Sequence, residues 1–80
     1  MPATATDVQT TVTDALESFG AEASDINREA SLESLDIDSL DLAELSQIAE
    51  EKYGVALKSS DMERIKTVGD AIDVIVERAA

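Results

Sequence analysis

The chemistry in this sequence is concentrated at one serine that stands between two aspartates. Ser39 directly follows Asp38 and lies two positions before Asp41, in the stretch from Leu35 to Leu45. A catalytic serine needs a base to take its proton and donors to hold an oxyanion. The chain has no His and no Cys, which excludes a Ser-His-Asp triad and a zinc site with His or Cys ligands. Because the neighbouring carboxylates would oppose a developing negative charge, we expect no catalytic serine and no enzyme.

Two other uses of the Ser39 hydroxyl remain. It can cap the start of a helix, which is worth about 0.5–2 kcal/mol relative to Ala. Asp38 already offers such a cap, so a second one is redundant. Alternatively, Ser39 is a modification site, because the backbone N–H groups and dipole at a helix start favour an attached phosphodiester by about 0.3–1 kcal/mol. The local sequence leaves both interpretations open.

Apolar residues at three- and four-residue spacing predict a first helix over about 7–19, with Thr6 as its cap and Gly20 as its stop. Residues 1–5 show no pattern and are expected to fray. The connection over 21–37 is long for a small domain and must be held down. A short helical turn is compatible with 32–35. The expected anchors are the large apolar residues Ile26, Leu32, Leu35 and Ile37.

Three further helix starts follow. The helix that carries Ser39 is expected over about 39–53, with Asp38 and Asp41 as a reciprocal cap and Gly54 as its end. The pattern Ser60-Asp61-Met62-Glu63 predicts a short helix through about Ile65. The pattern Thr67-Val68-Gly69-Asp70 predicts the start of the last helix. Its expected buried residues are Ala71, Ile72, Ile75, Val76 and Ala79.

The chain of 80 residues is long enough for one small domain, and 44% of its residues are hydrophobic. No strand pattern is present. The fold class is therefore all-α: a small four-helix bundle of three main helices and one short helix, with a long loop between the first two. Its only aromatic residues are Phe19 and Tyr53, so the core is expected to be aliphatic.

The formal net charge is −12, from 18 acidic and 6 basic residues. Such a charge argues against binding to nucleic acid or to an anionic membrane. It favours partners with basic surfaces, because complementary fields speed association. No apolar run is long enough to span a membrane, and the start lacks a signal-peptide pattern, so we expect a cytoplasmic monomer.

The aspartates around Ser39 also invite comparison with a calcium loop. Counted from Asp36, the fifth position is Leu40, the sixth is Asp41 and the twelfth is Gln47. An EF-hand requires an oxygen ligand, Gly and Glu there. We therefore predict no dedicated metal site.

Three segments in order resemble the acyl carrier protein family. Leu35-Asp36-Ile37-Asp38-Ser39-Leu40-Asp41 is similar to its serine loop, and Ala49-Glu50-Glu51-Lys52-Tyr53-Gly54-Val55 to the end of its second helix. Lys66-Thr67-Val68-Gly69-Asp70-Ala71 is similar to the opening of its last helix. The resemblance implies that a phosphopantetheinyl transferase attaches 4'-phosphopantetheine from coenzyme A to Ser39. The thiol of that arm then carries acyl groups as thioesters.

The resemblance also implies partners and their contacts. An acyltransferase, a ketosynthase and other acyl-processing enzymes would bind through basic patches. The matching positions on this chain are Asp38, Leu40, Asp41, Ala43, Glu44, Glu50 and Glu51. Each acid alone is more simply a solvated helix face, since an exposed ion pair is worth only about 0.2–1 kcal/mol. Together they oppose a single base on that helix, Lys52, which favours a collective role.

The sequence departs from the family at three positions. Asp36 stands where the family usually has Gly, so either the backbone there has a negative φ or Asp tolerates a positive one. Ser46 and Ala49 are smaller or more polar than usual. We expect these two residues, with Leu45, to shape an acyl pocket between the helices.

Two alternatives stay open. A peptidyl or aminoacyl carrier is usually less acidic and lacks an acid directly before the serine. A non-modified acidic interaction domain would use Ser39 only as a cap. Between fatty acid and polyketide synthesis the sequence does not decide.

Overall fold

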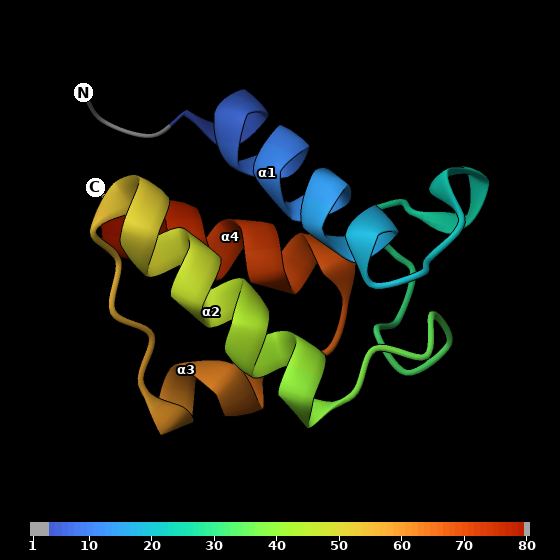
Figure 1. Cartoon of the computed structure of the whole chain (residues 1–80). Coiled ribbons are helices and arrows are strands. Elements are labelled where there is room, and N and C mark those ends of the chain that lie inside the picture. Colours follow the sequence, from blue (N-terminus) through green and yellow to red (C-terminus); the bar gives the residue numbers. More distant parts are fainter. Residues whose placement is uncertain (1–3, 80) are drawn as a thin grey trace.

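The computed structural model describes residues 4–79, and within them the chain folds into four α-helices and one short 3-10 helix (Figure 1). The predicted all-α class, with three main helices, one short helix and a long first connection, is confirmed. The only strand-like pairing among the described residues is an isolated bridge between Ser31 and Thr67. The elements are α1 (Ala5–Ser18), η1 (Ala23–Asp25), α2 (Ser39–Tyr53), α3 (Ser59–Arg64) and α4 (Val68–Ala79).

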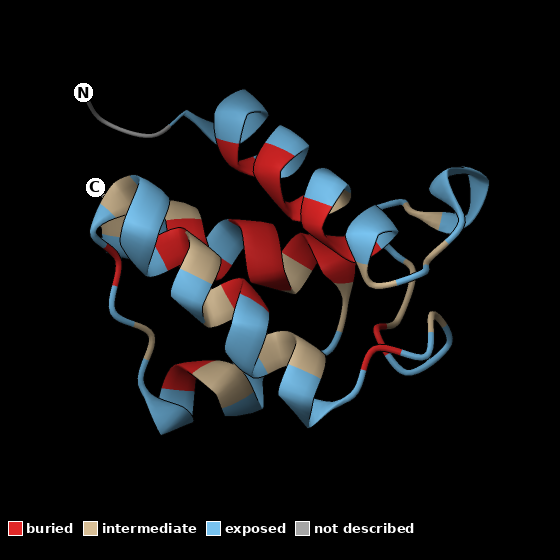
Figure 2. Ribbon diagram, in the orientation of Figure 1, coloured by how far each residue is buried: buried red, intermediate tan, exposed pale blue. Residues whose placement is uncertain are grey.

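The helices enclose a core around α4. Figure 1 shows α1 lying along α4, with α2 in front of α4 and the short α3 beneath α2. Buried residues line the inner side of α1 and most of α4, whereas the outer side of α2 is exposed (Figure 2). As predicted, the core is aliphatic, and Phe19 and Tyr53 are only partly buried. Its least exposed large side chains include Leu16, Leu45, Ile72, Ile75, Val8, Val12 and Val68.

The first helix begins earlier than the sequence suggested. Its cap is Thr4, whose hydroxyl oxygen accepts a hydrogen bond from the backbone N–H of Asp7 at 3.1 Å. The prediction of Thr6 as cap was therefore wrong, because the helix already begins at Ala5. Fraying at positions 4 and 5 stays a prediction. Thr4 was overlooked because Thr6 precedes an acid and both threonines are good caps. Residues 1–3, also expected to fray, lie outside the described residues.

The two short links around α3 are fixed by aspartates. At α3 the predicted Ser60–Glu63 box is not formed. Instead the helix begins at Ser59, and the Asp61 carboxylate accepts from the backbone N–H of Lys58 at 3.0 Å. At α4 the predicted pair is confirmed, since Asp70 N–H donates to the Thr67 hydroxyl at 3.1 Å. The backbone N–H groups of Lys66 and Thr67 bond the Asp70 carboxylate in return and lower its pKa.

The long connection between α1 and α2 is held against the start of α4. Leu32 N–H donates to Lys66 O, and Val68 N–H donates to Ala30 O, both at 3.0 Å. Gly69 N–H donates to Arg28 O at 3.0 Å, and a Cβ at Gly69 would lie 3.0 Å from that oxygen. Of the predicted anchors, Leu32 and Ile37 are buried, whereas Ile26 and Leu35 are partly buried. A turn also forms over the predicted 32–35, where Leu35 N–H donates to Leu32 O at 3.1 Å, and the 3-10 helix η1 lies upstream of it.

One carboxylate is buried. Asp61 is 1% exposed, and Arg78 near the end of α4 donates to both of its oxygens, at 2.7 and 3.2 Å. The pKa of the Asp61 carboxyl lies below its usual range, chiefly because Arg78 donates hydrogen bonds to it and secondly because the Lys58 N–H does. This cluster ties α3 to the far end of α4. No helix in the described part of the chain is long and apolar enough to cross a membrane.

Replacing Asp61 with Asn should destabilise the fold in a pH-dependent way. The pKa of the Asp61 carboxyl is lower in the folded protein than in the unfolded chain, where an Asp has a pKa of about 3.9. The stabilisation that this carboxylate provides is therefore complete above about pH 3.9. It is lost as the pH falls through the folded-state pKa. Urea unfolding should therefore show a clear deficit for D61N at neutral pH that closes below about pH 4.

D73N is the matched control, because it removes the same charge from the exposed Arg28–Asp73 pair. Its effect should stay within the range of about 0–1 kcal/mol seen for exposed pairs. Equal deficits in D61N and D73N would contradict a structural role for the buried carboxylate.

Candidate functional site

Ser39 is the first residue of α2, and Asp38 rather than Ser39 caps this helix. Asp41 N–H donates to the Asp38 carboxylate at 3.0 Å, and Asp38 N–H donates to the Asp41 carboxylate at 3.4 Å. This reciprocal cap confirms the prediction made from the Asp38–Asp41 spacing. Ser39 is exposed, and its hydroxyl makes no hydrogen bond to any residue between 4 and 79. The structure thus leaves that hydroxyl free to react.

The loop before Ser39 contains the one left-handed residue other than Gly among the described residues. Asp36 has φ 59°, so the backbone does adopt the conformation for which the family usually uses Gly. Aspartate tolerates this region better than most residues. The turn closes through Ile37 N–H, which donates to Leu32 O at 2.9 Å, and the Ile37 side chain is 7% exposed. The buried Ile37 therefore fixes the chain two residues before Ser39.

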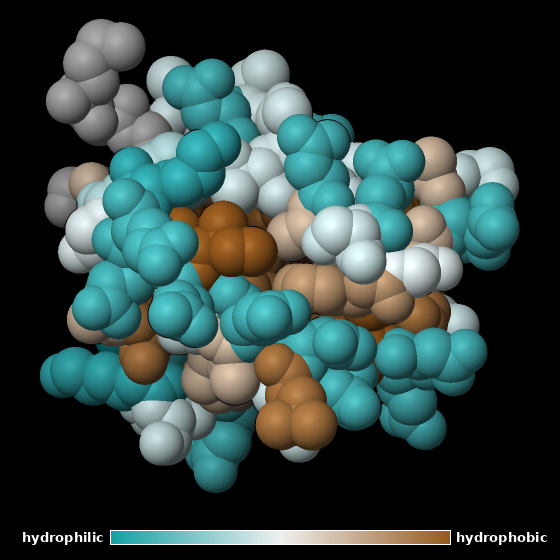
Figure 3. All heavy atoms as spheres, in the orientation of Figure 1, coloured by the Kyte–Doolittle hydropathy of each residue, from teal (hydrophilic) through white to brown (hydrophobic). Residues whose placement is uncertain are grey.

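The residues expected to meet partners lie on or beside α2 and are accessible. Leu40 is 78% exposed, the highest value among large apolar side chains described. Asp41 is partly buried because it takes part in the cap. In Figure 3, teal polar side chains cover this side of the molecule, with separate brown apolar patches between them. The exposed members of the set are Asp38, Leu40, Ala43, Glu44, Glu50 and Glu51.

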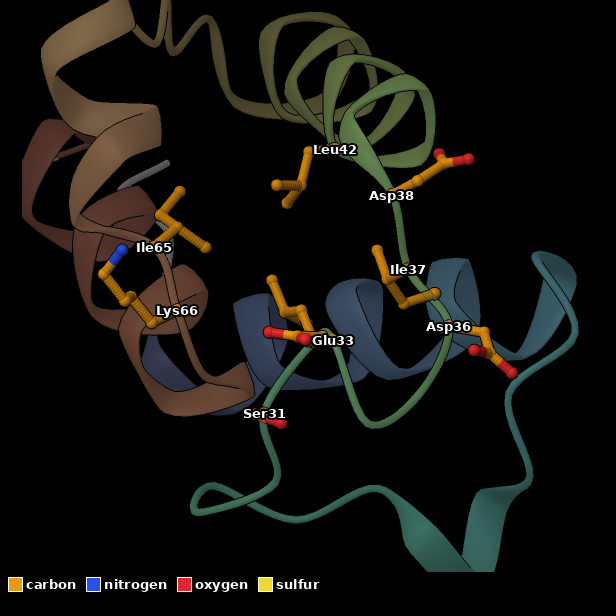
Figure 4. Close-up of a pocket in the computed structure, with 9 residues that line it drawn as sticks. Ser31, Glu33, Asp36, Ile37, Asp38, Leu42, Ile65 and Lys66 are labelled. Atoms are coloured by element: carbon orange, nitrogen blue, oxygen red, sulfur yellow. The ribbon is translucent and has the colours of Figure 1, made fainter.

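A cavity of about 540 Å³ opens beside Asp38, between α2, the preceding loop and the end of α3. In Figure 4 the side chains of Leu42, Ile37 and Ile65 point toward one another across it, whereas the carboxylates of Asp36 and Asp38 point away. The apolar lining thus comes from α2, from the loop before it and from the residue that follows α3, and the two aspartate carboxylates lie outside this apolar part. The remaining lining residues are Ser31, Leu32, Glu33 and Lys66.

The three residues predicted to shape an acyl pocket do not line this cavity. Leu45 and Ala49 are 2% and 1% exposed and belong to the core, and Ser46 is partly buried. A role for them in a loaded carrier stays a prediction. Sequence reasoning missed the lining formed by Leu42 and Ile65. The available signal was that Leu32, Ile37 and Leu42 are apolar residues spaced closely around Ser39.

The cap geometry predicts that two neighbouring substitutions change the stability of the fold by different amounts. Asp38→Ala removes the acceptor for Asp41 N–H and should reduce the free energy of unfolding by about 0.5–2 kcal/mol. Ser39→Ala removes a hydroxyl that has no bonding partner among residues 4–79 and should change the free energy of unfolding by less than about 0.5 kcal/mol. Denaturant unfolding of both variants measures the difference. A larger loss for Ser39→Ala would mean that the hydroxyl serves the fold.

The left-handed backbone at Asp36 predicts that Asp36→Gly is more stable than Asp36→Ala. The comparison cancels the loss of charge, and Ala at positive φ carries a strain of about 1–2 kcal/mol that Gly avoids. Denaturant unfolding should place the glycine variant higher by about 1 kcal/mol. Equal stabilities, or a more stable alanine variant, would show that the loop does not hold this conformation in solution.

Comparison with known proteins agrees with this geometry. Residues 7–75 match the family model described as "Phosphopantetheine attachment site". An acyl carrier protein of Chlamydia caviae is 42% identical over 64 residues, covering 79% of this chain and 83% of that protein. One from Acidothermus cellulolyticus is 43% identical over 60 residues, covering 74% and 71%. With a free serine hydroxyl at the start of an acidic helix and this similarity along most of its length, the chain belongs to the acyl carrier protein family.

Proposed function

We propose that Ser39 is the residue that receives 4'-phosphopantetheine, and that the 80 residues act as one carrier domain. Acyl carrier proteins carry this prosthetic group and are not enzymes. The single observation behind the choice of residue is the exposed Ser39 hydroxyl, which the Asp38 cap leaves without a hydrogen bond. The residues present fit a phosphodiester, because the helix start supplies N–H groups and the positive end of the dipole. When bound, the group supplies a thiol that can form thioesters.

The attachment step needs an enzyme other than this chain. Ser39 would form a bond to the phosphorus of coenzyme A's pantetheine phosphate, the diphosphate bond to the nucleotide would break, and the serine proton would leave. The two acidic side chains nearest to Ser39 in sequence are already engaged in the reciprocal cap. A phosphopantetheinyl transferase therefore supplies the base and the charge stabilisation.

The partners proposed for this carrier are the transferase that loads it and, once it is loaded, an acyltransferase, a ketosynthase and other acyl-processing enzymes. The acids Glu44, Glu50 and Glu51 are exposed on α2, and Leu40 offers an apolar contact at its start. A basic partner surface complements this arrangement and gains most from the sum of many weak ion pairs. With these partners and coenzyme A as its donor, the chain would work in the cytoplasm.

The acyl chain itself is proposed to use the cavity beside Asp38. Its volume of about 540 Å³ falls in the range typical of small-molecule sites, about 300–1,000 Å³. The apolar side chains of Leu42, Ile37 and Ile65 meet there and would shield a hydrocarbon chain from water.

Two related functions differ in cargo rather than in chemistry. The acid directly before Ser39 and the charge of −12 favour acyl over aminoacyl cargo. Within acyl chemistry, we propose fatty acid or related polyketide synthesis. The non-modified interaction domain is disfavoured because Asp38, not Ser39, performs the capping that it would require of Ser39.

The direct test is incubation of the purified chain with coenzyme A and a phosphopantetheinyl transferase, followed by intact-protein mass spectrometry. The wild type should gain the mass of one phosphopantetheine. Ser39→Ala should gain none while keeping its helical circular dichroism. Ser34→Ala, which alters an exposed serine in the loop before α2, is the control and should load like wild type. An unmodified wild type, or a modified Ser39→Ala, would refute the proposal.

A further inference from the structure

The edge of the cavity beside Asp38 carries an acid and a base that the fold does not use. Glu33 comes from the loop before α2, Lys66 comes from the short link between α3 and α4, and both line the cavity. Both residues are exposed. Within the described residues neither side chain forms an ion pair, either with the other or elsewhere, whereas all three arginines pair with carboxylates. The carboxylate and the ammonium group are therefore available to a ligand.

Backbone hydrogen bonds hold Glu33 and Lys66 at the same edge of the cavity. Leu32 N–H donates to Lys66 O at 3.0 Å, so the residue before Glu33 is tied directly to Lys66. On the other side, Asp36 N–H donates to Glu33 O at 3.1 Å and closes the turn that begins there. Because the backbone at both residues is fixed by these contacts, a ligand that enters the cavity at this edge meets both side chains.

The lining of the cavity is divided into an apolar part and this charged edge. The side chains of Leu42, Ile37 and Ile65 meet in the apolar part, and in the view of Figure 4 the Glu33 carboxylate lies across the cavity from Leu42. A carboxylate only accepts hydrogen bonds, whereas an ammonium group only donates them. A hydrocarbon chain uses neither group. An amide uses both, because its N–H donates and its C=O accepts.

The prosthetic group proposed for Ser39 contains such amides between its phosphate and its thiol. The cavity is within its reach, because Asp38, which directly precedes Ser39, also lines the cavity. When an acyl chain occupies the apolar part, the amide nearest the thiol comes to the edge of the cavity and is partly withdrawn from water. Withdrawing an amide from water is costly unless hydrogen-bond partners replace the water.

We propose that Glu33 and Lys66 bind the amide nearest the thiol when the acyl chain lies in the cavity. The Glu33 carboxylate accepts from the amide N–H, and the Lys66 ammonium group donates to the amide C=O. The proposal rests on the carrier function and on the use of the cavity proposed above, and it gives a ligand to two residues to which that function assigns none. Because the amide lies at a constant distance from the thioester, the two residues hold every acyl chain at the same depth.

Hydrogen exchange at the arm amides tests this contact without an assay of activity. The transferase loads the chain either from coenzyme A or from octanoyl-coenzyme A, each with isotope-labelled amide nitrogens, and NMR follows exchange at each amide. In the wild type, the amide nearest the thiol should exchange about two- to tenfold more slowly in the octanoyl form than in the unacylated form.

Glu33→Ala and Lys66→Ala should each remove most of this slowing in the octanoyl form. The two variants together separate hydrogen bonding from a simple effect of charge. Amide exchange is catalysed by hydroxide, which an acid repels and a base attracts, so charge alone would accelerate exchange in Glu33→Ala and slow it in Lys66→Ala. The matched control is Glu29→Ala, which removes another exposed acid of the same loop outside the cavity lining and should behave like wild type. Circular dichroism verifies that each variant is folded.

The outcomes distinguish this proposal from the carrier function. Wild type that cannot be loaded from coenzyme A refutes the carrier function itself. Normal loading with equal exchange in the octanoyl and unacylated forms refutes binding of the amide. Slowing that persists in Glu33→Ala, or that persists or increases in Lys66→Ala, refutes the assignment to these two residues.

Discussion

The reciprocal bonding between Asp38 and Asp41 is the interaction on which the functional end of this molecule depends. Each backbone N–H of the pair is satisfied by the other's carboxylate. The helix start therefore needs nothing from Ser39, which is exposed and whose hydroxyl has no hydrogen bond within the described part of the chain. The fold thus separates two roles that a serine at a helix start could combine, because one neighbour stabilises the helix and the serine remains available for attachment.

The rest of the structure keeps that helix start in place. Upstream, the left-handed turn at Asp36 and the buried Ile37 direct the chain into α2. The long loop between α1 and α2 is held in place by backbone hydrogen bonds to the segment at the start of α4. Downstream, Gly54 ends α2 with φ 69°, a conformation that glycine adopts without strain. A small aliphatic core supports these contacts, and the charged groups stay on the surface apart from Asp61, which Arg78 neutralises.

Much of this could be predicted from the sequence, where spacing carries a local physical signal. The period of apolar residues predicted the first helix, and cap patterns predicted the other three. Two of those patterns, the Asp38–Asp41 and Thr67–Asp70 pairs, are formed in the structure. The sequence did not reveal which of two threonines caps α1, because Thr4 and Thr6 are chemically equivalent caps. It also misplaced the box at α3, where the decisive partner of Asp61 is Arg78, 17 residues away. Long-range pairs of this kind have no local signature.

The same distinction applies to the candidate site. The exposed face of α2 followed from its period and charge, and six of the seven proposed contact residues on or beside α2 are exposed. The cavity did not follow, because Leu42 and Ile65 come from different helices and meet only through the tertiary fold. The small residues Ser46 and Ala49 suggested space, but the volume left by a small side chain depends on its neighbours. In this structure Ala49 is closely packed, at 1% exposure.

The most direct test of the account compares the stability of the chain with and without phosphopantetheine on Ser39. If the hydroxyl is idle in the fold, attachment removes no native interaction, and the phosphodiester meets the positive end of the α2 dipole. Denaturant unfolding of the loaded chain should then give a free energy equal to that of the unloaded chain or higher by up to about 1 kcal/mol. A loaded chain that is less stable by about 1 kcal/mol or more would show that Ser39 supports the helix start, and would contradict the account.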